Sequence, residues 1–137
     1  MSKHSFNIRA YALCINENSV LALHEYYAGT KLLKLPGGGL EYGEGLLECV
    51  KRELMEELNL EVGTLEHFYT QEDFLESRFR DNEQLLTVYY TTTIKDISKL
   101  KILDDSIEKV EWVSLLKENP FTLPIDRLVF DKLKKSL

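Results

Sequence analysis

The hydrophobic and polar positions along the chain change their spacing several times, and each change predicts a different element. Residues 6–15 and 20–26 are apolar and rich in strand-forming residues, and the polar residues between them are typical of a turn, so the pair predicts a hairpin. Residues 32–35 predict a short strand that ends at Pro36, because neither a regular strand nor a helix continues easily through proline and three glycines. Over residues 44–58 the apolar positions recur at helical spacing.

The second half of the chain returns to strand-like patterns and ends in a helix. Residues 64–74 and 84–94 predict two long strands joined by a charged segment, and residues 109–113 predict a short strand. A terminal amphipathic helix is expected from residue 125 onward, directly after a proline, which is favourable at a helix start. This order predicts one domain over residues 1–137 of the α+β class, with helices covering a mixed sheet in a layered sandwich.

Composition supports a folded domain and narrows its partners. Of the 137 residues, 44% are hydrophobic and 10% are aromatic, which is too apolar for a disordered chain. The net charge of -6 argues against a broad nucleic-acid surface and against a basic membrane-binding patch. The longest uninterrupted apolar run, residues 10–15, is too short to span a membrane. The isolated Cys14 and Cys49 predict reduced core residues of a cytoplasmic protein.

The acidic excess is concentrated in one segment. Residues 41–61 carry seven glutamates and two basic residues, a net charge of -5, whereas the other 116 residues carry a net charge of -1. Five of the seven glycines lie beside this segment, within residues 37–45. This combination of acids and glycines indicates where the chemistry of the chain is to be sought.

Three glutamates in the predicted helix lie close together in angle. At about 100° per residue, Glu53, Glu56 and Glu57 fall within an arc of about 100°, so their carboxylates can converge on one point. Glu53 and Glu57 border the apolar side of the helix, whereas a solvated acidic face would lie opposite the core. Carboxylates at this spacing repel one another, and an all-oxygen ligand set suits Mg2+ or Mn2+. The geometry favours a divalent-metal site over a plain acidic face.

The glycine-rich segment leads directly toward this helix. Gly37, Gly38 and Gly39 allow backbone groups to approach a ligand closely, and a glycine-rich turn before a helix is able to cradle phosphate. A plain tight turn is the alternative for the segment taken alone. Beside the carboxylates, however, it predicts a site for a phosphate-bearing substrate and Mg2+.

The segment LPGGGLEYGEGLLECVKRELMEELNLEV resembles the signature of the Nudix hydrolases, G-x5-E-x7-R-E-U-x-E-E-x-G-U, in which U is a bulky aliphatic residue. The matching positions are Gly38, Glu44, Arg52, Glu53, Leu54, Glu56, Glu57 and Leu60. We call residues 38–60 the Nudix box. Asn59 stands where the family has glycine, just past the expected helix end. Because asparagine tolerates positive φ better than most residues, this departure is expected to cost little stability.

The resemblance implies a Nudix-type α/β/α sandwich with a mixed β-sheet between helices. It also implies Mg2+-dependent hydrolysis, with Mn2+ as a substitute, of a nucleoside diphosphate linked to another moiety, by attack of water on phosphorus. In this reading Glu53 and Glu57 are the principal metal ligands, and Glu56 is a further ligand or the base that activates water. The backbone carbonyl of Gly37 completes the metal shell.

The remaining residues of the Nudix box have supporting roles by the same resemblance. Arg52 would orient the carboxylates, and an i,i+4 ion pair with Glu48 is its simpler role. Glu44 would support the junction between the loop and the helix, a structural role more than a catalytic one.

Candidates outside the Nudix box are less specific. Some family members take a base from a separate loop, where the acids of this chain are Asp104, Asp105 and Glu108; ordinary solvated acids are the simpler interpretation. The candidates for phosphate contacts are Arg9, Lys34, Arg78 and Arg80. The aromatic candidates for stacking on a base are Tyr11, Tyr26, Tyr27 and Phe74, with a place in the core as the alternative.

The substrate stays open at this level. The extra residues that accompany the family signature in hydrolases of ADP-ribose, diadenosine polyphosphates and coenzyme A are absent, which weakens these three assignments without excluding them. A nucleoside triphosphate or a nucleotide sugar is also open. A catalytically silent Nudix fold that senses a nucleotide or binds a partner is the alternative function. An isomerase on the same fold would need residues that the sequence does not identify, and a homodimer is compatible with the sequence.

Overall fold

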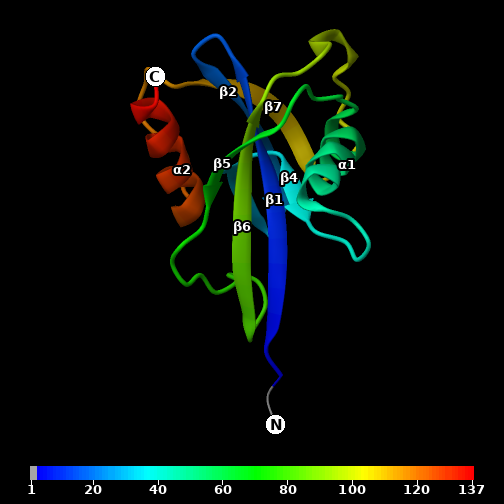
Figure 1. Cartoon of the computed structure of the whole chain (residues 1–137), viewed down its shortest axis with the longest axis vertical. Coiled ribbons are helices and arrows are strands. Elements are labelled where there is room, and N and C mark those ends of the chain that lie inside the picture. The colour runs from blue at the N-terminus through cyan, green and yellow to red at the C-terminus, as the bar shows by residue number, and fades with distance from the viewer. Residues whose placement is uncertain (1–2) are drawn as a thin grey trace.

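Strand β1 (Ser5–Asn16) runs through the centre of the molecule, in a computed structural model that describes residues 3–137 (Figure 1). It pairs in parallel with β6 (Glu83–Thr92) over ten residues, from Ser5 opposite Glu83 to Cys14 opposite Thr92. Its residues from Ala10 to Cys14 are all buried, as expected for a strand covered on both faces. The parallel pairing beside antiparallel neighbours makes the sheet mixed.

The predicted N-terminal hairpin forms only at its tip. Strand β2 (Ser19–Tyr27) pairs with β1 at Ile15 and Asn16, and beyond these residues the two strands separate. Strand β2 instead pairs with β3 (Thr30–Lys34) on one edge and with β7 (Ile107–Ser114) on the other. The apolar pattern identified both strands, but strand-forming residues do not specify which neighbour a strand pairs with.

Two further predictions required correction. The glycines expected to interrupt regular structure form strand β4 (Gly37–Gly39), which pairs with Arg9 to Tyr11 of β1, because backbones without side chains approach closely. Strand β5 (Glu66–Thr70) ends before the predicted residue 74. The buried Gln71 side chain donates hydrogen bonds to the carbonyls of Asp73 and Leu85, which replaces ladder bonds and turns the chain away.

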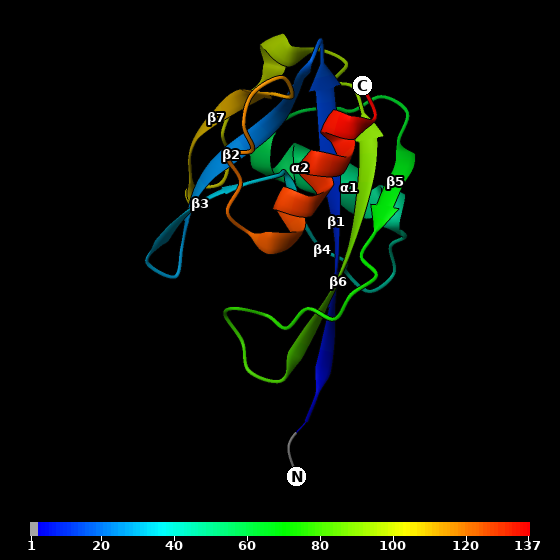
Figure 2. The same ribbon diagram turned by 90° about the vertical axis from the view of Figure 1, so that its left-hand side faces the viewer.

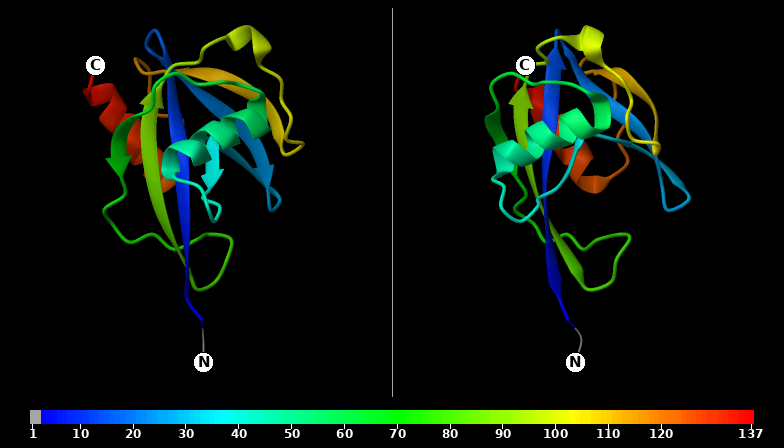
Figure 3. Two further views of the ribbon diagram at one scale, coloured as in Figure 1. Left: turned by 45° about the vertical axis from the view of Figure 1, so that its right-hand side comes forward. Right: turned by 90° about the vertical axis from the view of Figure 1, so that its right-hand side faces the viewer.

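Helices α1 (Leu46–Leu58) and α2 (Pro124–Lys135) cover opposite faces of the strands, with α1 in front and α2 behind in Figure 3. Side chains of β1 alternate between the two sides. Ala10, Ala12 and Cys14 belong to the core cluster that includes the buried residues of α1, whereas Tyr11 and Leu13 belong to the cluster that includes those of α2. The α+β class with a mixed sheet between helices is therefore confirmed.

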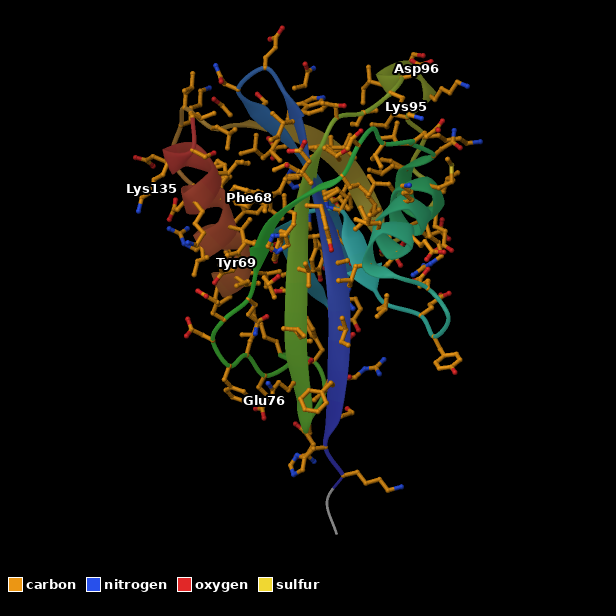
Figure 4. The ribbon with its side chains drawn as sticks, viewed as in Figure 1. Phe68, Tyr69, Glu76, Lys95, Asp96 and Lys135 are labelled. Carbon is orange, nitrogen blue, oxygen red and sulfur yellow. The ribbon has the colours of Figure 1, made fainter. Side chains whose placement is uncertain are left out.

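Strand β5, a short 3-10 helix and the two cysteines complete the description of the fold. Phe68 and Tyr69 of β5 lie toward α2 (Figure 4), and the Lys132 ammonium of α2 stands 5.1 Å from the centre of the Tyr69 ring. A short 3-10 helix (Ile97–Lys99) precedes β7. Both cysteines are free and buried, as predicted. Among residues 3–137, no helix is long and apolar enough to cross a membrane.

Candidate active site

The start of helix α1 is held by its own glutamates. The Glu48 carboxylate accepts a hydrogen bond of 3.0 Å from the backbone N–H of Gly45, the residue at the helix N-cap. Glu44 does the same for the N–H of Glu41 in the preceding loop, also at 3.0 Å. Because Glu48 is used as a cap, the simpler role considered for Arg52, an ion pair with Glu48, is not what the structure shows.

Arg52 instead joins the loop to the helix. Its guanidinium donates two hydrogen bonds to the Glu44 carboxylate, of 2.6 and 3.0 Å, and one of 3.0 Å to the carbonyl of Gly39. Nη1 of the same group donates to Glu53 at 2.8 Å and to Glu56 at 3.1 Å. The hydrogen bonds from Arg52 hold the pKa of Glu44 at about 2, so Glu44 stays ionised in this network.

Glu57 is the most buried glutamate of the predicted set. Its exposed fraction is 6%, and its Oε1 accepts a hydrogen bond of 3.1 Å from the backbone N–H of Gly37. Burial raises the pKa of Glu57 to about 8; the Lys34 ammonium and the Gly37 N–H oppose the rise, and the charge of Glu53 adds to it. Burial also raises the pKa of Glu53, against the hydrogen bond from Arg52. Two carboxylates are thus close together, and both are poorly solvated.

The glycines of β4 make room for these carboxylates. A Cβ atom at Gly38 would lie 2.6 Å from the carboxyl carbon of Glu53, so the helix side chain reaches this strand only because residue 38 has none. At Gly37, where φ is +146°, a Cβ would collide with the backbone of Ala10 and Tyr11 on β1. Both glycines are therefore required by the fold or by the site.

The donor set fits a hard divalent cation at Glu53 and Glu57. Both are carboxylates, neither is balanced fully by protein charge, and the Gly38 position leaves their approach clear. Within residues 3–137, however, no three His, Cys, Asp or Glu side chains converge as a complete ligand cluster. The exposed Glu56 is turned toward Arg52, which also holds one oxygen of Glu53. The structure therefore brings together two of the three predicted carboxylate ligands.

Two basic side chains near these carboxylates also line a large cavity. Arg9 of β1 and Lys34 of β3 both line this cavity of about 630 Å³ and both influence the carboxylates of the box electrostatically. Arg9 Nε donates a hydrogen bond of 2.6 Å to the Tyr11 hydroxyl, and Lys34 Nζ lies 3.4 Å from a carboxylate oxygen of Glu25. Both predicted phosphate-contact residues therefore lie in the cavity, each paired with a neighbouring side chain.

Of the remaining candidates for phosphate contacts and base stacking, some line the cavity and others do not. Arg78, Arg80, Tyr11 and Tyr27 line the cavity; Tyr26 and Phe74 are not among the described residues that do. Tyr11 is buried in a stack with Tyr89, with ring centres 5.2 Å apart.

The loop acids have partners of their own. Asp104 accepts hydrogen bonds from the backbone N–H and the hydroxyl of Ser106, and Glu108 lies 3.9 Å from Lys31. In space, the loop passes the C-terminal end of α1, where the Leu103 N–H donates a hydrogen bond to the carbonyl of Glu57. The loop therefore runs close to the backbone of the site. The Asp104 side chain makes contacts within the loop, whereas Glu108 belongs to β7 and lies beside Lys31 of β3.

Several polar and aromatic residues of the cavity were missed by the sequence analysis, among them Glu25, Phe79 and Asp126. Glu25 had a signal, because strand alternation aligns it with the buried Leu21 and Leu23. Asp126 lies in the first turn of α2, where an acid is ordinary, yet it is buried and accepts a hydrogen bond of 2.8 Å from the Tyr89 hydroxyl. Phe79 lies in a loop and had no signal.

Known proteins share the domain and the fold described above. Residues 6–132 match the NUDIX domain. The fold is similar to that of a MutT NUDIX hydrolase from Burkholderia pseudomallei, with a TM-score of 0.79 and 16% identity over 93% of this chain and 98% of that one. It is similar to a NUDIX hydrolase from Nitrosomonas europaea, with a TM-score of 0.79 and 18% identity over 95% and 89% of the two chains. A MutT protein from Methanosarcina mazei Go1 has a TM-score of 0.70 and 23% identity over 99% and 98%.

Proposed function

The chain belongs to the NUDIX family of hydrolases, and on this premise we propose that it is a divalent-metal-dependent pyrophosphohydrolase. Its substrate is a nucleoside diphosphate linked to another moiety, such as a nucleoside triphosphate or a nucleotide sugar. Water attacks phosphorus, and one phosphoanhydride bond is broken. The observation that carries the proposal is the pair of carboxylates, the buried Glu57 and the half-buried Glu53, against the glycine backbone of β4.

Glu53 and Glu57 would hold the metal, with the carbonyl of Gly37 and the carboxylate of Glu56 as further ligands. Mg2+ or Mn2+ bound by these groups supplies Lewis-acid polarisation of the phosphate oxygens. Glu56 is exposed and lies in the hydrogen-bonded network of Arg52, so it also has the solvent access that a water-activating base needs. Arg52 and Glu44 keep the helix carboxylates aligned with the loop.

Arg9 and Lys34 would bind the phosphates of the substrate, together with backbone groups of Gly37, Gly38 and Gly39. Both side chains line the cavity next to the acidic pair, so a phosphate there meets positive charge on the cavity side. The partner that this arrangement suits is a nucleotide-type small molecule. The charge of the carboxylates themselves repels such a ligand, which is why the metal is part of the proposal.

The test is hydrolysis of a nucleotide panel in the presence of Mg2+ and of Mn2+, with wild type compared with Glu57→Gln. We expect kcat/KM of the variant to fall by at least about 100-fold, because removing a metal ligand costs more than removing an outer-shell partner. Glu61→Gln is the matched control, since Glu61 is an exposed acid of the same segment, paired with Lys95 at 2.8 Å.

Equal activity of wild type and Glu57→Gln would contradict the proposal. Nucleotide binding without metal, and without turnover of any member of the panel, would support the silent sensing or partner-binding module instead. A normal rate for Glu61→Gln is required before the loss in Glu57→Gln is assigned to the site.

A further inference from the structure

The two cations beside the carboxylates of the Nudix box are held by different kinds of partner. Lys34 forms an ion pair with Glu25, whose two carboxylate oxygens lie 3.4 and 3.5 Å from the ammonium nitrogen. Arg9 instead donates a hydrogen bond of 2.6 Å from Nε to the Tyr11 hydroxyl, and in the part of the chain that the structure describes no carboxylate forms an ion pair with it. Because a hydroxyl is neutral, it holds the guanidinium without cancelling its charge.

The Arg9 guanidinium lies between Tyr11 and the glycine strand β4. Arg9 and Tyr11 are two residues apart on β1, so the alternation of the strand places both side chains on the same face. Nε faces the Tyr11 hydroxyl, while Nη1 lies 3.6 Å from the position that a Cβ atom of Gly39 would occupy. A guanidinium donates hydrogen bonds in a fixed fork, so a partner that fixes Nε also fixes the direction in which the Nη groups donate.

Tyr11 itself has a fixed position. Its ring is buried and stacks on Tyr89 of β6, with the ring centres 5.2 Å apart and the planes at 21°. A Cβ atom at Gly37 would lie 2.7 Å from a carbon of the Tyr11 ring, so the ring packs directly on the backbone of β4. In Figure 2, α2 lies in front of β1 and β6, and Tyr11 belongs to the core cluster that includes the buried residues of α2. A ring packed on these sides holds its hydroxyl in one place.

Packing alone does not account for the hydroxyl. Phenylalanine would supply the same ring for the stack with Tyr89 and the contact with Gly37, whereas a buried hydroxyl requires a hydrogen-bond partner. Without this acceptor, the Arg9 guanidinium would be drawn toward the charges of Glu53 and Glu57, which act on it already. Such a pairing would occupy the cation and the metal ligands at once.

We propose that Tyr11 is a positioning residue, whose hydroxyl fixes Arg9 so that the Nη groups of the guanidinium face the phosphates of the substrate beside β4. This inference rests on the proposed function for the identity of the ligand. Tyr11 acts through Arg9 and is not assigned a contact with the substrate. One of the aromatic candidates for stacking on a base thereby receives a different role.

The test is binding of a phosphate ligand that is not hydrolysed. Methylenediphosphonate carries two bridged phosphorus groups without base or ribose, and its dissociation constant is measured by calorimetry with Mg2+. The proteins are wild type, Tyr11→Phe, Arg9→Met and the double variant. Tyr90→Phe is the matched control, because Tyr90 is a buried tyrosine of β6 that belongs to the core cluster on the α1 side and is not among the described residues that line the cavity.

We expect Tyr11→Phe to weaken methylenediphosphonate about 10-fold, the effect of one hydrogen bond to a charged group. Arg9→Met should weaken the ligand at least as much. Addition of Tyr11→Phe to Arg9→Met should change the dissociation constant by less than about twofold, because no guanidinium remains to be held. A loss of packing would act equally in both backgrounds, so this coupling separates positioning from a structural effect. Tyr90→Phe should bind the ligand as wild type does.

Hydrolysis gives a second readout for Tyr11→Phe. With a substrate that wild type hydrolyses, KM should rise about 10-fold while kcat changes by less than about threefold, because Arg9 contacts the phosphates both before and during the reaction. A lower kcat at unchanged KM would contradict the positioning role.

Wild-type affinity for methylenediphosphonate in Tyr11→Phe would overturn the inference, as would an equal effect of this substitution with and without Arg9. A wild type that binds the ligand no more tightly than Arg9→Met does would also overturn it. Because calorimetry measures binding without turnover, the two proposals fail separately. Equal hydrolysis by wild type and Glu57→Gln, with the coupling intact, removes the proposed function alone. Hydrolysis that depends on Glu57, with no coupling between Tyr11 and Arg9, removes the positioning role alone.

Discussion

At the residue scale, neighbouring glycines of β4 serve different purposes. Gly37 has a φ of +146° and lies where a Cβ would collide with the backbone of β1, so its lack of a side chain is a condition of folding. At Gly38 the nearest atoms to a Cβ belong to the carboxylate of Glu53, the flexible end of a side chain. Gly39 has neither constraint, since a Cβ there would be 3.6 Å from Arg9.

Substitution of each of these glycines by alanine is expected to separate an effect on stability from an effect on the hydrolysis rate. Gly38→Ala should keep most of its stability but displace the Glu53 carboxylate, and a displacement of about 1 Å is enough to lower kcat by about 100-fold. Gly37→Ala should unfold more readily, because its φ alone costs about 1–3 kcal/mol before the collision with Ala10 is added. Gly39→Ala is the control. Thermal unfolding and hydrolysis rates measure both effects; equal rates for Gly38→Ala and Gly39→Ala would contradict this account.

The single departure from the family signature is also explained at this scale. Asn59 adopts left-handed backbone angles, with φ at +57° and ψ at +35°, directly after the last turn of α1. Its side-chain amide donates a hydrogen bond of 3.0 Å to the carbonyl of Lys99. Asparagine therefore takes the conformation for which glycine is usual, and its side chain adds a contact that glycine lacks.

At the element scale, α1 is both a core helix and the carrier of the site. Val50 and Leu54 are fully buried on one side, while Glu53 and Glu57 lie at the edge of that buried side, as the helical spacing predicted. Among residues 3–137, Arg52 is the one cation that pairs directly with Glu53 and Glu56. The acids lie toward the C-terminal half of the helix, where the macrodipole disfavours negative charge. The helix is therefore under electrostatic strain that a bound cation would relieve.

Metal binding should stabilise the fold measurably through this helix. At a Mg2+ concentration ten times its dissociation constant, we expect the Tm of wild type to rise by about 3–6 °C, because the cation binds the folded carboxylates only. Glu53→Gln and Glu57→Gln should lose most of this rise. Glu61→Gln should retain it, since Glu61 pairs with Lys95 outside the site. Equal rises in all four proteins would show that Mg2+ acts elsewhere on the molecule.

At the scale of the whole molecule, one buried hydrogen bond joins α2 to the sheet. The Tyr89 hydroxyl of β6 donates to the carboxylate of Asp126, and both residues are buried and line the cavity. Burial raises the pKa of Asp126 to about 6, although the hydrogen bond from Tyr89 and the charges of Lys34 and Arg9 favour its ionised form. The ionised carboxylate therefore weakens the docking of α2.

The pH dependence of stability should reveal this group. In the unfolded chain Asp126 loses its proton near pH 3.8, whereas in the folded protein it keeps the proton up to about pH 6. Between these values the folded state binds more protons, so the contribution of Asp126 to the free energy of unfolding decreases as pH rises, by at most about 3 kcal/mol. The stabilising contribution of Asp126 is complete at a pH below its pKa in the unfolded chain. It is lost at a pH above its pKa in the folded protein.

Urea unfolding of wild type and Asp126→Asn at pH 4, 5, 6 and 7 measures this contribution directly. The variant keeps an acceptor for Tyr89 but cannot ionise, so the stability of wild type relative to the variant should fall across the series. A difference that stays constant with pH, or that rises with pH, would contradict the assignment. Because the other titrating groups are common to both proteins, their contributions cancel in the comparison.

Local pattern and tertiary structure determined different parts of this protein. The sequence by itself determined the helices, most strands, the family and the identity of the acids in the box, because side-chain spacing and glycine content are local properties. It did not determine that β1 pairs in parallel with β6, that Arg52 pairs with Glu44, or that Glu25, Phe79 and Asp126 line one cavity. Those facts depend on contacts between residues distant along the chain, and only the packing of β1 between two helices brings them together.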